Sequence, residues 1–383
     1  MDTLRIGIVG AGAIAQRNAR DTAASGVATI AGVFDINHKA ARDMAHDLSA
    51  PFFSSYEDML KSEEVDAVLL SVPHHLHRSM TVQAAEAEKH VLVEKPIANT
   101  LSEAEEMIKA CNANGVKMTV NYSFRYLPKI LKAKQLIDDG ALGEITGFQT
   151  CIQQYKNRGY WTGASSNSPD NWRASKAKCG GGFLIMTACH NVDYLYYITG
   201  LKGTRVYSEY ATLGSPAEVE DIISISYRMG ERAVGSFSAS SIMRGMEQKE
   251  ERIWGTNGSL LIHPEGLEMY STRPIEGKRP GKVHKFKKFP NVSWTAEWVK
   301  GFVNAVWSDT MPPVSYVDAW ENLAFIITAY QSMEERRALT VPEFISTLGW
   351  SRWRERGDRN PRPSIDGRCR QPRLWHRKNA WPR

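Results

Sequence analysis

The first third of the chain alternates between short apolar runs and segments with helical periodicity. Leu4, Ile6 and Ile8 belong to a run that is apolar on both faces, which favours a central parallel strand covered by helices on each side. The predicted strands after this one are residues 28–35, 51–54, 66–72, 90–93 and 116–120, and the predicted helices are residues 14–21, 38–48, 75–88 and 102–114. The alternation over about 120 residues predicts a doubly wound parallel sheet.

The pattern changes near Leu142, where strand-like segments follow one another without regular helices between them. Such strands predict a large, mostly antiparallel open sheet in a second, α+β domain. The predicted strands of this half are residues 143–155, 206–212, 222–228 and 233–240, and the predicted helices are residues 184–197, 294–307 and 317–338. We therefore expect an α/β first domain at residues 1–122, an α+β domain at 123–345 whose last helices pack back on the first domain, and a tail at 346–383.

Composition favours an ordinary globular protein, with 42% apolar and 23% charged residues. No apolar run approaches the length of a membrane span, and the first strand begins too early to leave room for a signal peptide, so the cytoplasm is the expected location. The five cysteines are odd in number and widely spaced, which favours reduced thiols over a disulfide framework or a zinc site.

The net charge of +6 comes from the tail. From residue 350 onward there are eleven basic and three acidic residues, or +8, so the remaining 37 basic and 39 acidic residues carry −2. One interpretation of the tail is a disordered appendage or a frame-altered end that adds nothing to the fold. The other is a basic, Trp-bearing arm that contacts nucleic acid, which nothing else in the sequence supports.

A glycine-rich turn follows the first strand. The pattern Gly10-x-Gly12-x-x-Ala15 leads directly into a predicted helix, and such a turn lets the backbone approach a pyrophosphate at the helix N-terminus. Asp35 ends the next apolar run about 20 residues later, where a ribose-binding carboxylate belongs. Together these features predict a Rossmann-type dinucleotide-binding domain. A carboxylate at Asp35, followed by Ile36 and Asn37, favours NAD, with NADP as the lesser option.

Three more polar motifs end predicted strands, at the edge where open α/β sheets bind ligands. They are residues 71–77, 94–96 and 121–128. Lys95, in the second of them, would lie near a nicotinamide ring, where an amine can take and return the proton that alcohol oxidation requires. The histidines at 74, 75 and 77 suggest a metal cluster, but no other ligand has usable spacing, so we expect solvated loop histidines and no metal.

These motifs resemble those of the glucose–fructose oxidoreductase, inositol dehydrogenase and rhizopine-catabolism (Gfo/Idh/MocA) family over residues 4–345. The resemblance depends on the turn at 10–15, Pro73-x-x-x-His77, Glu94-Lys95-Pro96, Arg125, Trp172-Arg173, and Gly180-Gly181-Gly182 followed by His190-x-x-Asp193. It implies a Rossmann domain, a second domain whose open sheet commonly forms the interface of a homo-oligomer, dimer or tetramer, and NAD(P)-linked oxidation or reduction of sugars, inositols and their derivatives.

The resemblance also implies site residues. Lys95 is similar to the family's catalytic lysine, with His190 assisting it. Substrate binding is expected from Asp193, Trp161, Arg125, Trp172 and Arg173, and cofactor binding from Gly10, Gly12, Ala13, Ile14, Asp35, Ser71, Val72, Pro73, His77, Glu94, Lys95 and Asn121. Several of these residues also have a purely structural interpretation. His77 would cap a helix, His190 and the two tryptophans would pack in the core, and the two arginines would form structural ion pairs.

The sequence departs from the family pattern at Met186. Members with a catalytic triad usually carry Asp four residues before the histidine, and a methionine does not hold a proton. We expect an active dehydrogenase because Lys95, His190 and Asp193 remain. The alternatives are a catalytically impaired sensor that binds NAD(P), and a family member that uses NAD transiently to cleave glycosidic bonds.

Overall fold

A five-stranded parallel sheet forms the first domain of the computed structural model, which describes residues 3–163 and 171–344. Its strand order is β2-β1-β3-β4-β5. The strands are β1 (Leu4–Val9), β2 (Ala28–Phe34), β3 (Ala67–Leu70), β4 (His90–Val93) and β5 (Met118–Val120). All four residues of β3 are buried, as expected for a strand covered on both faces. The predicted strand at 51–54 is wrong: Phe52 makes only an isolated bridge with Val33.

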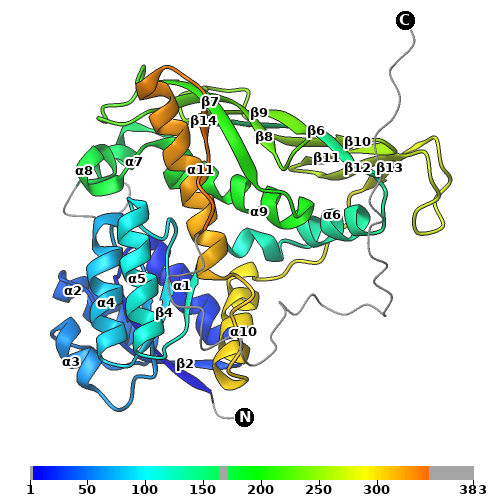
Figure 1. The fold of residues 1–383 in the computed structure, drawn as a ribbon. Coiled ribbons are helices and arrows are strands. Elements are labelled where there is room, and N and C mark those ends of the chain that lie inside the picture. The colour runs from blue at the N-terminus through cyan, green and yellow to red at the C-terminus, as the bar shows by residue number, and fades with distance from the viewer. Residues whose placement is uncertain (1–2, 164–170, 345–383) are drawn as a thin grey trace, which may run out of the picture. The chain divides into compact units, whose positions relative to one another are not determined.

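Helices cover both faces of this sheet. Figure 1 shows α4 and α5 on one face and α1 on the other. The helices of this domain are α1 (Ala13–Ala24), α2 (His38–Asp47), α3 (Tyr56–Lys61), α4 (His77–Glu86) and α5 (Leu101–Ala113). Thr100 caps α5 and forms a reciprocal capping box with Glu103, which fixes where this helix begins.

A nine-stranded sheet forms the second domain, with the order β13-β12-β11-β10-β6-β9-β8-β7-β14. Its strands are β6 (Ile145–Gln153), β7 (Gly203–Ala211), β8 (Ile222–Met229), β9 (Ala233–Ser240), β10 (Gln248–Gly255), β11 (Gly258–His263), β12 (Gly266–Ser271), β13 (Val283–Phe286) and β14 (Leu339–Thr340). Only β6 and β9 pair in parallel. The predicted fold class, a Rossmann domain followed by a mostly antiparallel open sheet, is confirmed, although β10 to β13 were not predicted.

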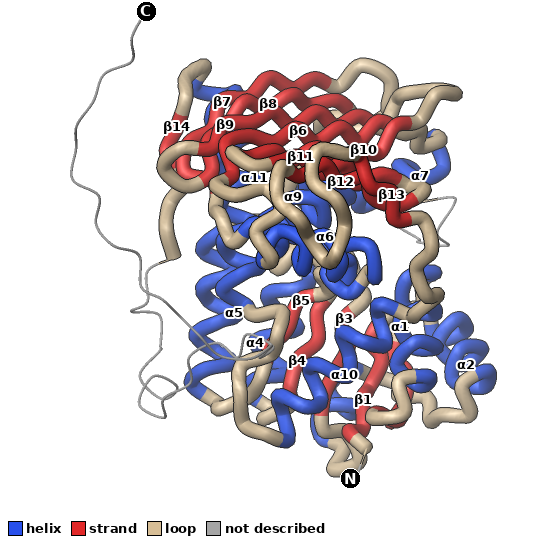
Figure 2. Tube along the Cα trace, turned by 90° about the vertical axis from the view of Figure 1, so that its right-hand side faces the viewer, coloured by secondary structure: helices blue, strands red, loops and turns tan. Residues whose placement is uncertain are grey.

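One face of the large sheet carries its helices. Figure 2 shows α6 (Pro128–Asp138), α9 (Cys189–Thr199) and α11 (Tyr316–Glu335) between the two sheets, and no helix over the opposite face in the described part of the chain. Burial alternates along β8 for this reason: Ile223, Ile225 and Tyr227 are buried, whereas the residues between them are exposed.

The chain returns to the first domain through α10 (Trp294–Trp307). This helix packs against α1, and the Arg17 guanidinium lies 4.6 Å from the centre of the Trp294 ring. The Trp298 indole donates a hydrogen bond of 3.0 Å to Thr119, whose hydroxyl donates to the Val314 carbonyl. The predicted tail at 346–383 lies outside the described residues. None of the described helices is long and apolar enough to cross a membrane.

Candidate active site

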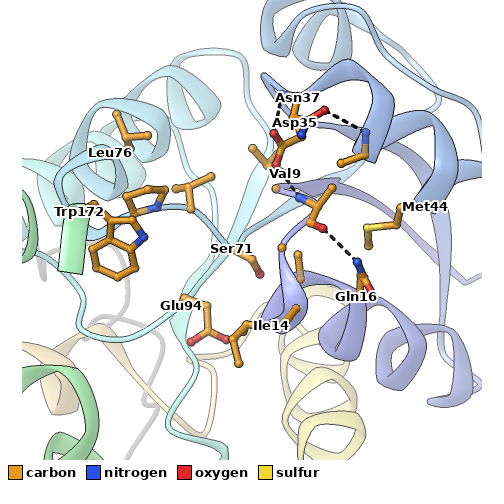
Figure 3. Close-up of a pocket in the computed structure, with 18 of the residues that line it drawn as sticks. Val9, Ile14, Gln16, Asp35, Asn37, Met44, Ser71, Leu76, Glu94 and Trp172 are labelled. Carbon is orange, nitrogen blue, oxygen red and sulfur yellow. Dashed lines mark hydrogen bonds between the residues drawn. The ribbon is translucent and has the colours of Figure 1, made fainter. Parts of the chain in front are cut away.

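A cavity of about 820 Å³ lies at the carboxyl ends of β1 to β4, where the second domain covers them. Its volume is within the range of ligand sites, roughly 300–1,000 Å³. Figure 3 shows Asp35 and Met44 on one side of it and Glu94 and Trp172 on the other. The cavity brings together most of the residues expected at a cofactor site: Gly10, Gly12, Ala13, Ile14, Asp35, Ser71, Val72, Pro73, Glu94 and Lys95. His77 and Asn121 do not line it.

The glycine-rich turn has the geometry that an anion site requires. Gly10 has a φ of +104°, and a Cβ there would lie 2.5 Å from the Ser71 carbonyl oxygen, so only glycine fits. Gly12 begins α1 without a side-chain cap, and a Cβ there would meet nothing within 4 Å. The N-terminus of α1 therefore faces open space in the cavity with its backbone N–H groups, as a phosphate-binding helix does.

Asp35 stabilises this turn from the end of β2. Its carboxylate accepts hydrogen bonds from the backbone N–H groups of Ala11 and Asn37, both at 2.7 Å (Figure 3). The carboxylate lines the cavity beside the turn. It is thus held in place to accept further hydrogen bonds from the hydroxyls of a ribose.

Glu94 is fixed by two amides. Its Oε1 accepts hydrogen bonds of 2.7 Å from the Nδ2 atoms of Asn18 and Asn121. Asn121 therefore does not line the cavity but holds the Glu94 carboxylate in place. Its own Oδ1 is buried without a partner among the described residues. The sequence interpretation missed Asn18; the signal available was a polar residue on the otherwise small, buried face of α1.

These features fit a dinucleotide. The glycine turn and the open N-terminus of α1 suit a pyrophosphate, Asp35 suits a ribose, and the far end of the cavity suits a nicotinamide ring beside Glu94 and Lys95. The fit depends on backbone geometry and on the placement of donors and acceptors among the described residues.

Lys95 connects the two domains. Its Nζ donates a short hydrogen bond to the main-chain carbonyl of Met186. That carbonyl lies in a π-helical segment, Leu184–Ala188, which precedes α9 and was not predicted. Single π turns occur frequently at functional sites. The backbone at position 186 thus holds Lys95, while the Met186 sulfur lies 3.7 Å from the Tyr160 hydroxyl.

The triple glycine positions this segment. A Cβ on Gly181 would lie 2.5 Å from the Tyr330 hydroxyl, and one on Gly182 only 1.9 Å from the Glu220 carbonyl oxygen. The buried Glu220 carboxylate accepts the backbone N–H groups of Gly182 and Leu184, so an acid caps the helical segment that carries Met186. Burial raises the pKa of Glu220 to about 7.

His190 is not among the residues that line the cavity, although the charge of Lys95 acts on it. Its ring stacks on Phe124 with 4.1 Å between ring centres and 11° between planes. Burial, followed by the charge of Lys95, lowers its pKa well below the usual range, so the imidazole is neutral at neutral pH. Its Nδ1 has no hydrogen-bond partner among the described residues.

Asp193 does not reach the cavity. Its carboxylate accepts two hydrogen bonds from Arg125, from Nε at 2.8 Å and from Nη2 at 2.6 Å, and both side chains are buried. Asp318 lies 3.4 Å from the same guanidinium. A buried guanidinium needs such partners, which explains why Arg125 and Asp193 occupy each other instead of a substrate.

The aromatic and arginine residues expected at the substrate separate into two groups. Trp172 and Arg173 line the cavity, with the Arg173 guanidinium 4.6 Å from the centre of the Trp172 ring. Trp161 is only 1% exposed and lies in the core. Lys156 and Tyr160, which no motif indicated, line the cavity beside Trp172.

Two of the three histidines after β3, His74 and His77, are buried, contrary to the expectation of solvated loop histidines. His77 is fully buried, with Nδ1 2.8 Å from the Pro96 carbonyl oxygen and Nε2 3.1 Å from that of Val72. It therefore joins the loop that follows β3 to the loop that follows β4. His74 packs against Trp172. Among the described residues, no three side chains of metal-ligating type cluster together.

The fold and the cavity define a class: a two-domain protein whose Rossmann domain binds a dinucleotide at the edge of a second, sheet-forming domain. Residues 4–122 match the oxidoreductase family with an NAD-binding Rossmann fold, and residues 130–261 match the GFO/IDH/MocA C-terminal domain. The chain belongs to the GFO/IDH/MocA family of oxidoreductases.

Relatives within this family differ in substrate. The chain is 27% identical to a levoglucosan dehydrogenase from Pseudarthrobacter phenanthrenivorans, over 69% of this chain and 75% of that protein. It is 22% identical to a myo-inositol 2-dehydrogenase from Thermotoga maritima, over 89% of this chain and 100% of that protein. A structure of levoglucosan dehydrogenase in complex with NADH and levoglucosan matches 89% of this chain and 100% of its own, with a TM-score of 0.79 and 22% identity, which shows a shared fold.

Proposed function

We propose that this protein transfers a hydride between NAD and a secondary hydroxyl, or the corresponding ketone, of a sugar, cyclitol or glycoside. The observation that carries the proposal is the position of Lys95, which lines the same cavity as the glycine turn and Asp35. The names of the relatives, a levoglucosan dehydrogenase and a myo-inositol 2-dehydrogenase, support this class of substrate.

The reaction removes a hydride from the carbon and a proton from the hydroxyl oxygen of one carbinol. Together these are two electrons and two protons. The bound nicotinamide supplies the hydride acceptor, or the donor in the reverse direction. Lys95 accepts the hydroxyl proton as the C–H bond breaks, so that the carbinol becomes a carbonyl and the amine becomes an ammonium. In reverse, the ammonium returns that proton to the oxygen. The hydrogen bond to Met186 uses one position on Nζ and leaves the others for substrate.

His190 supports Lys95 in this proposal without exchanging the proton itself. A neutral imidazole stacked on Phe124 adds no second positive charge that would act on Lys95. Trp172 and Tyr160 would contact the substrate's C–H faces, because flat aromatic faces suit the apolar faces of sugar rings. Asp193 has no role in substrate binding in this proposal.

NAD is the proposed cofactor, with NADP as the lesser option. The Asp35 carboxylate would repel a 2′-phosphate, and neither Ile36 nor Asn37 offers a positive charge to compensate. Asn37 is instead the cap of α2, where its side chain accepts the N–H of Ala40.

A homo-oligomer, a dimer or tetramer, is proposed through the face of the large sheet opposite its helices. Exposed apolar side chains lie there on neighbouring strands: Val234 is 49% exposed and Trp254 40%, and both are paired with Gly147 of β6. Large exposed apolar patches mark interaction sites in soluble proteins.

The competing hypothesis is a sensor that binds NAD(H) without turnover, and Met186 favours it because a thioether replaces the usual carboxylate. A panel of sugars, inositols and glycosides assayed for NAD reduction separates the two. We expect turnover, and a loss of roughly 10²- to 10⁴-fold in kcat for Lys95→Ala, the contribution of one general base. Lys61→Ala, which removes an exposed lysine outside the cavity, is the matched control.

Two other results would change the proposal. NADH binding without turnover of any compound on the panel would favour the sensor. Sugar released from a glycoside without net NADH would favour the glycoside-cleaving alternative. Full activity in Lys95→Ala would overturn the assignment of the proton acceptor.

A further inference from the structure

The segment that carries the acceptor of Lys95 begins inside the protein. Residues 182–186 are all buried, and the first N–H groups of a helical segment have no partner within it. A buried N–H group without an acceptor destabilises the folded state, so native proteins provide one. The start of this segment therefore depends on acceptors that other elements supply.

Glu220 supplies three of these acceptors. Its Oε2 accepts the N–H of Gly182 at 2.5 Å, and its Oε1 accepts the N–H of Leu184 at 2.8 Å. Its main-chain carbonyl accepts the N–H of Phe183 at 3.0 Å. One residue thus holds three consecutive N–H groups of the segment.

Tyr330 of α11 supplies the next acceptor. Its hydroxyl accepts the N–H of Ile185 at 3.3 Å and donates a hydrogen bond of 3.0 Å to Oε1 of Glu220. Three donors therefore converge on the two carboxylate oxygens, and both oxygens are needed as acceptors. The fifth N–H, that of Met186, bonds to the Gly182 carbonyl at 3.0 Å, within the segment itself.

Both anchors belong to the frame of the second domain. Glu220 is buried and stands two residues before β8. The carboxylate of its neighbour Asp221 accepts the N–H groups of residues 213–215 at 2.7–3.1 Å, which fixes the chain at this point. Tyr330 lies on α11, which packs against β7. The segment is thus held by the sheet and by its longest helix.

Lys95 depends on this segment for its own position. In the described part of the chain, the Met186 carbonyl is the acceptor for the one hydrogen bond that Nζ donates. A lysine nitrogen at the end of a flexible four-carbon stem is mobile unless a partner holds it. The place of Nζ in the cavity is therefore set by the peptide group at position 186.

We infer that Glu220 and Tyr330 are positioning residues of the reaction: they hold residues 182–185, which fixes the Met186 carbonyl and, through it, the Lys95 Nζ. This inference rests on the proposed function, in which that nitrogen takes the substrate's proton. Neither side chain lines the cavity, so neither contacts the substrate. A misplacement of about 1 Å at a reacting group can cost about 10²-fold in rate.

Two variants remove the anchors, and a third is the matched control. Glu220→Gln keeps the size of the side chain but turns one accepting oxygen into a donating nitrogen, so one of the three donors loses its acceptor. Tyr330→Phe removes only the hydroxyl. Glu251→Gln changes another buried glutamate, which accepts a hydrogen bond from Asn191 and none from residues 182–186 among the described contacts.

The first readouts need no substrate. Hydrogen exchange of the full chain, followed by mass spectrometry, reports the protection of the amides of residues 182–186. Acetylation by N-acetoxysuccinimide reports the access of Lys95, with the exposed Lys61 as the internal reference. Measurements at about pH 8.5 keep Glu220 ionised, because burial raises its pKa to about 7. We expect both rates to rise about five- to tenfold in Glu220→Gln and Tyr330→Phe, the effect of one lost hydrogen bond, and to stay unchanged in Glu251→Gln.

The kinetic readout uses the panel compound that the parent oxidises fastest. Glu220→Gln and Tyr330→Phe should lower kcat by about 10- to 100-fold, with KM for that compound and for NAD nearly unchanged. In a Lys95→Ala background, Glu220→Gln should lower kcat no further, because both changes act through the same nitrogen. A similar further loss in that background, or a loss that appears mainly in KM, would reduce Glu220 to a structural role and overturn the inference.

The results separate this inference from the proposed function. If sugars are oxidised but the acetylation of Lys95 is unchanged in both variants, the inference fails and the proposed function stands. If no compound on the panel is oxidised, the proposed function fails, and exchange and acetylation still decide whether Glu220 and Tyr330 hold Lys95. If Glu220→Gln does not fold, Tyr330→Phe decides by the same comparisons.

Discussion

Replacing Asp193 tests whether this residue serves the fold or the substrate. Asp193→Leu would leave the buried Arg125 guanidinium with Asp318 alone, at 3.4 Å, in place of two hydrogen bonds of 2.8 and 2.6 Å. Breaking a buried ion pair from one side costs about 3–5 kcal/mol, because the remaining charge stays buried. We therefore expect the free energy of unfolding to fall by that amount.

The double variant Arg125→Met, Asp193→Leu sharpens this test. Replacing both charges by apolar side chains removes the guanidinium that would otherwise keep only the longer contact with Asp318, so part of the lost stability should return. Urea unfolding of the single and double variants gives the coupling between the two residues. Glu57→Leu, which removes one partner of an exposed ion pair on α3, should leave the urea midpoint nearly unchanged.

Catalytic measurements on the same variants test whether Asp193 also contacts the substrate. If Asp193 only holds Arg125, the folded double variant should retain KM for its substrate within a small factor. An Asp193→Leu variant that is as stable as the parent but has a strongly raised KM would show that the carboxylate reaches the substrate, against this account.

Three further predictions follow from single contacts. Gly182→Ala would place a Cβ 1.9 Å from the Glu220 carbonyl oxygen, so a loss of about 1–3 kcal/mol in thermal unfolding is expected, and an unchanged midpoint would contradict the packing argument. Burial raises the pKa of Glu251 from 4.5 to about 7, so its contribution to stability is complete below pH 4.5 and is lost as the pH rises through 7. The difference in unfolding free energy between the parent and Glu251→Gln should therefore fall by about 3 kcal/mol over that window, and a constant difference would refute the assignment. Asp35→Ala should raise the ratio of NADP to NAD affinity while weakening NAD binding, because the Ala11 N–H loses its acceptor, and an unchanged ratio measured by fluorescence titration would remove Asp35 from cofactor selection.

The first domain was predictable because its signals are local. Strands that are buried on both faces are continuous apolar runs, and the Gly10 turn needs a backbone that only glycine adopts. The strands β10 to β13 were missed, and the sequence of β10 lacks such a run. The β10 sequence begins Gln-Lys-Glu-Glu, and only Glu251 and Ile253 of that strand are buried.

The site was predictable in part. Asp35 and Lys95 stand at the carboxyl ends of predicted strands, and that position in the sequence is enough to indicate a ligand site. The pairing of Arg125 with Asp193 joins residues 68 positions apart, and no local pattern separates it from substrate binding. Lys156 and Tyr160 come from the segment after β6, which has no motif, and the π turn at 184–188 leaves no distinct periodicity.

The central claim is that a nicotinamide ring and a carbinol meet at Lys95. A crystal structure of the full chain with NADH and a compound that it oxidises tests this most directly. We predict the nicotinamide ring beside Glu94 and Lys95, with the substrate oxygen within hydrogen-bond distance of the Lys95 Nζ. A ring bound elsewhere, or a substrate oxygen far from that nitrogen, would contradict the account.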